Sequence, residues 1–235
     1  MKVIRDEFNL LPVLWKLEYF DEYLKDVEKL IDSKAIELGN RAAEMVQEIE
    51  QEPETTGWHY AALDLFLEED YEKVENVFPN LLRRSLFIYI YSVFEDALNN
   101  CCRLLNFQHR PLEDVKGKDR GIKRARRYLN DAGVKFPDEK WEEITYYQKL
   151  RNCIIHNQGR LKGCDHEKDV REFALSNIYL SLTHTDNEGK NIEEMSEFVE
   201  IMFHKRFCEE VMETIGDFVE QLRINMEHRQ RNEDF

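Results

Sequence analysis

The sequence predicts a mainly α-helical fold, a helical bundle with a small β-hairpin before its last helix. Only 9 glycines and 5 prolines occur among 235 residues, so few positions interrupt a helix. Apolar residues recur at intervals of three and four over most of the chain, which is the spacing of helices with one buried face. One stretch near residue 180 alternates apolar and polar residues instead, as a strand does.

The first 80 residues predict two helices. The first should run from Leu14 to Ile49, because its apolar residues keep helical spacing while its other face is acidic. Pro53 and Gly57 should end it, since neither residue continues a helix cheaply. A second helix is expected from Trp58 to Val77.

The next helix should be the centre of the bundle. Phe78 and Pro79 punctuate the chain, and Asn80 is suited to cap a new helix that runs to Leu105. Five charged residues interrupt this apolar stretch, which excludes a membrane span.

Two further helices are expected in the middle of the chain. A short basic helix should cover residues 121–129. Asp138 can cap a following helix that contains Trp141, Ile144, Leu150 and residues 151–156. Asn157-Gln158-Gly159 should end that helix.

The C-terminal third should contain the hairpin and a closing helix. Residues 173–183 change to strand spacing and a turn follows at 186–189, so a β-hairpin is predicted over residues 173–194. The closing helix is expected from Met195 to Met226, with its apolar stripe in the core or in a dimer seam. We predict one domain over residues 1–235, with residues 1–78 as an N-terminal helical extension, and two domains as the alternative.

Cysteine content indicates a cytoplasmic protein. The five cysteines are an odd number without a disulfide-like framework, and the N-terminus lacks a signal-peptide pattern. A zinc site at Cys153, His156, Cys164 and His166 is an alternative, but their spacing departs from the usual paired ligands. We therefore predict neither a metal nor a cofactor.

Charge is distributed unevenly along the chain, whose formal net charge is −15. Residues 1–80 hold 8 basic and 20 acidic groups, a net charge of −12, and residues 163–235 hold 8 and 18, a net charge of −10. Residues 81–162 hold 17 basic and 10 acidic groups, a net charge of +7. This basic middle segment is where we expect an anionic partner to bind.

The clearest chemical pattern is Arg-Asn-Cys-Ile-Ile-His at residues 151–156, in which four residues separate Arg151 from His156. It resembles the R-x(4–6)-H signature of the HEPN family, in which Asn often follows the Arg, as Asn152 does here. Similarity to the defence and toxin branches of that family covers residues 80–160, including Ser-Val-Phe-Glu-Asp at 92–96, Arg-Tyr-Leu at 127–129 and Trp-Glu-Glu-Ile at 141–144. The resemblance implies a HEPN-like helical bundle, and many members of the family are metal-independent endoribonucleases.

Cleaving RNA without a metal requires proton transfer from a 2′-hydroxyl and a cation for the charge that develops on the phosphate. His156 suits the proton transfer because an unperturbed histidine titrates near pH ~6.5, and the fork of Arg151 suits the phosphate. Asn152 would position the substrate or the imidazole. Glu95 lies where relatives often place a polar residue facing the signature helix, and could fix Arg151 or His156. We predict these four residues as catalytic.

Each of these residues also has a purely structural interpretation. His156 could be a hydrogen-bonded histidine at a helix end, and Glu95 a solvent-facing glutamate. Arg151 could form an ordinary ion pair with Glu95, Glu142 or Glu143.

Residues 116–127 hold seven basic residues and one acidic residue. On a helix these cations form ridges that can follow a phosphate backbone, although a charged run can also be only a solvated face. The predicted RNA-binding residues are Lys118, Arg120, Lys123, Arg124, Arg126 and Arg127.

The function expected from these observations is that of a toxin or antiphage-defence endoribonuclease. It would cut tRNA or mRNA by attack of a 2′-hydroxyl on the adjacent phosphate, leaving a 2′,3′-cyclic phosphate and a 5′-hydroxyl. The resemblance further implies a homodimer whose two signatures share one cleft, and an antitoxin or other protein is a further expected partner. The alternatives are a non-catalytic HEPN-type RNA- or protein-binding module and a helical adaptor.

Overall fold

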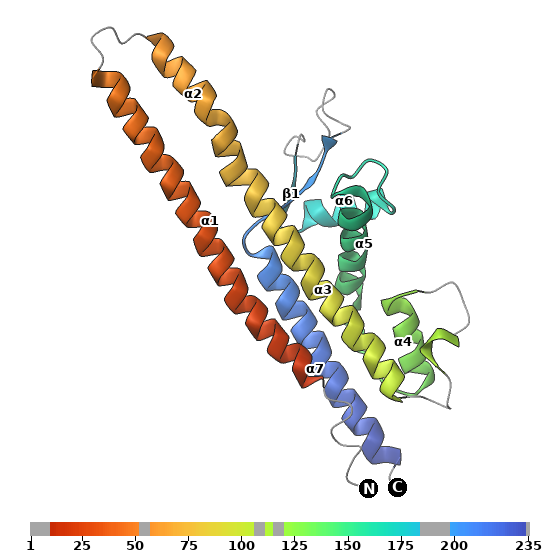
Figure 1. Cartoon of the computed structure of the whole chain (residues 1–235). Helices are drawn as coiled ribbons and strands as arrows, with labels where there is room; N and C mark the ends of the chain where they lie inside the picture. The colour runs from red at the N-terminus through yellow and green to blue at the C-terminus, as the bar shows by residue number, and fades with distance from the viewer. Residues whose placement is uncertain (1–9, 52–56, 106–110, 115–119, 184–197, 234–235) are drawn as a thin grey trace.

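The structure, a computed structural model, describes residues 10–51, 57–105, 111–114, 120–183 and 198–233 and is mainly helical, as the sequence predicts. Helix α1 (Leu11–Gln51) runs antiparallel to a rod formed by α2 (Gly57–Glu72), a π-helical turn (Lys73–Val77) and α3 (Phe78–Leu105) (Figure 1). The last helix, α7 (Phe207–Glu233), packs against α1 and α3. No helix in the described part of the chain combines the length and apolarity that a membrane span requires.

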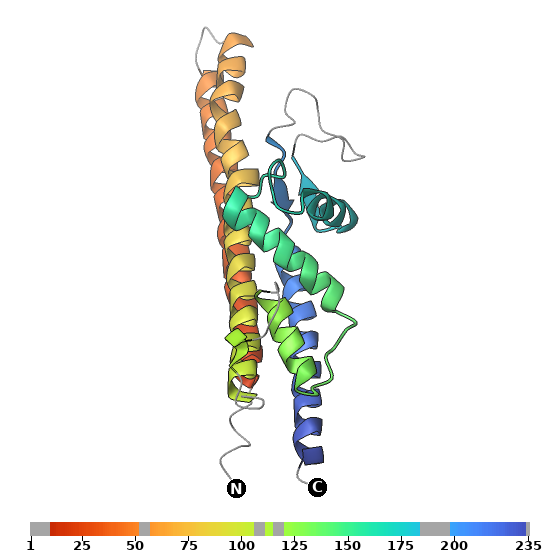
Figure 2. The ribbon, with the colours of Figure 1, turned by 90° about the vertical axis from the view of Figure 1, so that its right-hand side faces the viewer.

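A second layer covers the other side of α3. It consists of a 3₁₀ turn (Leu112–Asp114), α4 (Ile122–Asp131), α5 (Trp141–Asn157) and α6 (Glu167–Ser176). Figure 2 shows α5 crossing α3 obliquely, with its C-terminal end beside α3. The prediction that Asp138 caps α5 was wrong, because its carboxylate forms an ion pair with Arg126 and no side chain caps α5.

The rod is continuous where the sequence predicts a break. Pro79 lies in the first turn of α3, directly after the π-helical turn, whose wider hydrogen-bonding pattern accommodates a residue that has no N–H. Asn80 does not cap a helix start. It is 5% exposed and binds β2 (Ile201–Phe203) instead, donating from Nδ2 to the Ile201 carbonyl at 3.4 Å and accepting from the Phe203 N–H at 3.0 Å.

Two separate cores stabilise the fold. The main core is formed by α3, α5 and α7 together with the N-terminal half of α1, which contributes Phe20 and Leu24. A smaller core, formed by Leu38, Leu63 and Leu67, holds the far end of α1 against α2. These two helices therefore form an arm that extends beyond the rest of the molecule (Figure 1).

The small sheet lies before α7, as predicted, but its boundaries differ. Strand β1 (Leu180–Leu182) pairs antiparallel with β2, and Leu180 lies opposite Phe203. The predicted hairpin over 173–194 was wrong in two respects: residues 173–176 belong to α6, and the partner strand is residues 201–203. Val170 and Ala174 are buried four residues apart, which is helical spacing, so they bury one face of α6. The predicted turn at 186–189 lies outside the described residues.

The closing helix also begins later than the sequence predicts. Met195 lies outside the described residues, and residues 201–203 form β2, so α7 begins only at Phe207. The strand is favoured here because Ile201 and Phe203 point into the core while Met202 is half-buried.

Candidate functional site

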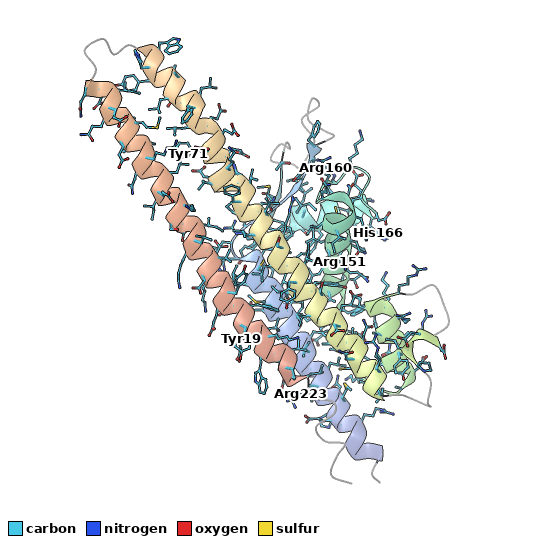
Figure 3. All side chains as sticks on the ribbon, in the orientation of Figure 1. Tyr19, Tyr71, Arg151, Arg160, His166 and Arg223 are labelled. Carbon is cyan, nitrogen blue, oxygen red and sulfur yellow. The ribbon has the colours of Figure 1, made fainter. Side chains whose placement is uncertain are left out.

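Helix α5 carries the signature residues. Its buried face consists of Ile144, Tyr147, Leu150, Cys153 and Ile154. Arg151 and Asn152 are half-buried at the edge of this face, and His156 is exposed near the end of the helix. Figure 3 shows Arg151 where α5 meets α3.

The helix remains regular through His156, so Arg151 and His156 diverge by about 140° around its axis. It ends as predicted: Gln158 adopts a left-handed conformation with φ 58°, and the Gly159 N–H donates to the Cys153 carbonyl at 3.2 Å. Within the described residues, no hydrogen bond joins His156 to Arg151 or Asn152. One protomer therefore presents the two proposed reactive groups on different sides of α5.

A buried arginine that the sequence analysis did not identify fixes this helix end. Arg84 of α3 is 6% exposed and donates to the Gln158 carbonyl at 3.1 Å and the Ile201 carbonyl at 3.2 Å. A β-carbon at Gly159 would lie 2.7 Å from Arg84 Cζ, so the close approach requires glycine. The available signal was a charged residue within the apolar helix 81–105.

Arg84 also forms an ion pair with Glu200 at 3.3 Å. Burial lowers the pKa of Arg84, and Glu200 opposes that change. Arginine remains charged at any physiological pH, so a positive charge is fixed between α3, β2 and the end of α5.

The guanidinium of Arg151 has no carboxylate partner within the described residues. Its Nη1 donates to Asn152 Oδ1 at 3.0 Å, and its buried Nε has no hydrogen-bond partner there. The ion pairs with Glu95, Glu142 or Glu143 that were the structural alternative are not formed. Glu143 instead accepts a hydrogen bond from the Tyr147 hydroxyl at 2.6 Å.

Glu95 lies at the junction of α3, α4 and α5. Its Oε1 lies 2.5 Å from the point that a β-carbon of residue 121 would occupy, and Gln148 Nε2 lies 3.2 Å from the same point. Gly121, with φ 55°, leaves room for this carboxylate at the start of α4.

The buried hydroxyl of Tyr91 is influenced electrostatically by both Glu95 and Arg151. Tyr91 is 1% exposed, and its hydroxyl has no hydrogen-bond partner among the described residues. Burial raises the pKa of Tyr91, Glu95 raises it further, and Arg151 lowers it. The charges of Glu95 and Arg151 therefore act on the same buried hydroxyl, whereas no influence of His156 on it is resolved.

Three of the predicted RNA-binding residues, Lys123, Arg126 and Arg127, line one cleft beside α4. Arg120, Lys123 and Arg127 are exposed, whereas Arg124 and Arg126 are half-buried. Arg124 and Arg126 lie on opposite flanks of α4, because the buried face of this helix is formed by Ile122, Ala125, Tyr128 and Leu129. Lys118 lies outside the described residues.

The proposed zinc ligands do not cluster in the described part of the chain, where no group of three or more His, Cys, Asp or Glu side chains is placed to hold a metal. Burial raises the pKa of both Cys153 and Cys164. These thiols are therefore neutral near pH 7 and act as weak donors, Cys153 to the Arg160 carbonyl at 3.3 Å and Cys164 to the Asp165 carbonyl at 3.1 Å.

Comparisons with known protein families, curated proteins and solved structures found no match for this chain. The geometry of the site therefore carries the functional argument. A half-buried cation without a carboxylate partner among the described residues is suited to binding an anion.

Proposed function

We propose that this protein is a metal-independent HEPN-type endoribonuclease that acts as a cytoplasmic homodimer in a toxin or antiphage-defence setting. The observation that carries the proposal is the guanidinium of Arg151. It is half-buried in a strongly acidic chain, yet it pairs with no carboxylate among the described residues. Because an unpaired buried charge is costly, an anionic ligand such as an RNA phosphate would stabilise this arrangement.

The proposed mechanism assigns one task to each residue. Arg151 would bind the phosphate and stabilise its developing charge, and His156 would take the proton of the attacking 2′-hydroxyl and give it to the departing 5′-oxygen. Asn152, which accepts a hydrogen bond from Arg151, would fix the orientation of the guanidinium. Glu95 would influence the electrostatic surroundings of Arg151 and would not contact the imidazole of His156.

Dimerisation would complete the site. Arg151 and His156 diverge around α5, so one protomer does not direct both groups to a single phosphate. A two-fold axis beside α5 would place the exposed His156 of each protomer near the half-buried Arg151 of its partner. Ile155, which is 42% exposed next to His156, would contribute apolar surface to such an interface.

The decisive test is cleavage of tRNA and mRNA in EDTA. Wild-type protein should produce fragments ending in a 2′,3′-cyclic phosphate, whereas His156→Ala should be slower by roughly 100-fold or more. His228→Ala, which changes another exposed histidine on α7, should cleave normally. Undiminished cleavage by His156→Ala, or cleavage only with added divalent metal, would contradict the proposal.

RNA binding tests the role of α4 separately. Replacing the exposed Arg120, Lys123 and Arg127 by Ala should weaken binding and flatten its salt dependence, by roughly 0.7 in log–log slope for each lost contact with a single strand. A variant with three exposed lysines of α1 replaced, Lys25, Lys29 and Lys34, should bind as the wild type does. Equal behaviour of the two variants would show that α4 is only a solvated face.

A second candidate function is supported by the separation of Arg151 from His156. A non-catalytic HEPN-type module would bind RNA through Arg151 and α4 without cleaving it, and an acidic surface would suit a basic protein partner such as an antitoxin. Binding without cleavage, in a protein that sediments as a dimer, would favour this function over the enzyme. A helical adaptor would neither bind RNA nor cleave it.

A further inference from the structure

A cleft of about 470 Å³ lies between the basic face of α4 and the first two turns of α5. Trp141 and Thr145 of α5 line one part of it, and the α4 residues that line the rest are Lys123, Arg126, Arg127, Asn130 and Asp131. The signature is on the same helix: Thr145 precedes Arg151 by six residues, which is about 9 Å along the axis and about 120° around it, so a strand must follow the surface of α5 to reach both. A strand bound at Arg151 could therefore extend into this cleft.

One wall of the cleft is a preorganised planar cation. The Arg126 guanidinium lies 5.0 Å from the centre of the Trp141 ring and 5.3 Å from that of Phe136, and it forms an ion pair with Asp138. These contacts fix its orientation, while 32% of the side chain remains exposed. RNA-binding proteins stack unpaired bases on such arginine planes and on aromatic rings.

The rim of the cleft is suited to a phosphate. Lys123 and Arg127 are exposed one turn apart on α4, so both side chains reach the same side of the opening. Cations spaced in this way follow a polynucleotide backbone.

Asp131 does not suit a phosphate. It is exposed at the last position of α4, where a negative charge is opposed by the helix dipole, and it forms no ion pair within the described part of the chain. Next to it, Asn130 offers an exposed amide. Carboxylates and amides accept hydrogen bonds from the exocyclic amino groups of bases, so this end of the cleft suits a base edge.

We propose that the α4–α5 cleft binds one nucleotide of single-stranded RNA and selects a base with an exocyclic amino group, such as adenine or cytosine, over uracil. This inference rests on the proposed function, because it places the nucleotide on the strand whose phosphate Arg151 binds. The base stacks on Arg126, its amino group donates to Asp131, and its phosphate contacts Lys123 and Arg127.

The test measures binding of equal-length oligoadenylate, oligocytidylate and oligouridylate by fluorescence anisotropy in the His156→Ala background, which prevents cleavage. The adenine and cytosine oligomers should bind at least tenfold more tightly than the uracil oligomer. Asp131→Ala should reduce this preference to less than twofold without weakening binding of oligouridylate, because it also removes a charge that repels phosphate. Glu44→Ala, which removes an exposed carboxylate on α1, should leave the preference unchanged.

The outcomes separate this inference from the proposed function. An unchanged preference in Asp131→Ala, or equal binding of all three oligomers, overturns the nucleotide site even if the wild type cleaves RNA. Selective binding that depends on Asp131, in a protein that does not cleave RNA, supports the site and refutes the nuclease. Failure to bind any of the oligomers overturns the nucleotide site, and cleavage of tRNA and mRNA in EDTA then decides the proposed function by itself.

Discussion

Replacing Arg84 by Met should destabilise the protein and reduce its proposed activity together. Removing one partner of a buried ion pair costs roughly 3–5 kcal/mol. We expect a cost at the lower end of this range, because Glu200 is 34% exposed and keeps its ion pair with Arg160 at 3.7 Å. The Gln158 and Ile201 carbonyls also lose a donor, while the Met side chain refills part of the space. We expect a loss of about 3 kcal/mol, or roughly 6–12 °C in Tm for a chain of this size.

Urea unfolding followed by circular dichroism would measure the loss, and RNA cleavage below the transition would measure activity. Arg103→Met is the matched control, because Arg103 lies on the same helix, is 53% exposed, and makes only surface contacts, with Glu113 at 3.9 Å and Asn100 at 2.9 Å. It should change stability by less than about 0.5 kcal/mol. If Arg84→Met loses less than about 1 kcal/mol, or loses stability while cleaving at the wild-type rate, Arg84 does not position the end of α5 in the way the structure indicates.

Two further predictions concern buried hydroxyls and the shared site. Tyr91→Phe should raise stability by about 1 kcal/mol, because it removes a buried hydroxyl that has no partner among the described residues. Tyr147→Phe should lower stability by about 1 kcal/mol, because the Tyr147 hydroxyl donates to Glu143. Equal losses of stability for the two variants in thermal unfolding would refute this reasoning. Mixing Arg151→Ala with His156→Ala protomers should restore part of the cleavage if one Arg and one His act across the dimer axis, and should restore none if both copies of each are needed; a monomer that cleaves at the full rate would exclude a shared site.

Much of the fold could be predicted because helical spacing is a local property. Helices α1, α4 and α5 lie close to their predicted bounds, since each repeats its apolar residues at three and four intervals. The break expected at Pro79 failed because a π-helical turn lets the rod continue. The prediction that Asn80 caps a helix was wrong, because Asn80 binds the backbone of Ile201 and Phe203. These partners are more than 120 residues away, so no local pattern indicates them.

The candidate site was predictable in its residues but not in its arrangement. The spacing of Arg151 and His156 fixes their divergence on any regular helix, and the structure retains that divergence. The sequence does not reveal that Arg84 donates to the Gln158 carbonyl, because this contact joins residues of separate elements, 74 positions apart. The basic run also appears uniform in sequence, yet folding divides it between an exposed ridge and a side chain stacked on Trp141.

The arm and the body share one uninterrupted rod but are stabilised very unequally. Three fully buried leucines hold the far end of α1 against α2, whereas the body buries aromatic side chains on α3, α5 and α7. Local opening should therefore begin at the arm, and its backbone amides should exchange with solvent well before those of α3. A partner that bound to the arm would have to order the α1–α2 pair, and this ordering would reduce the free energy of binding.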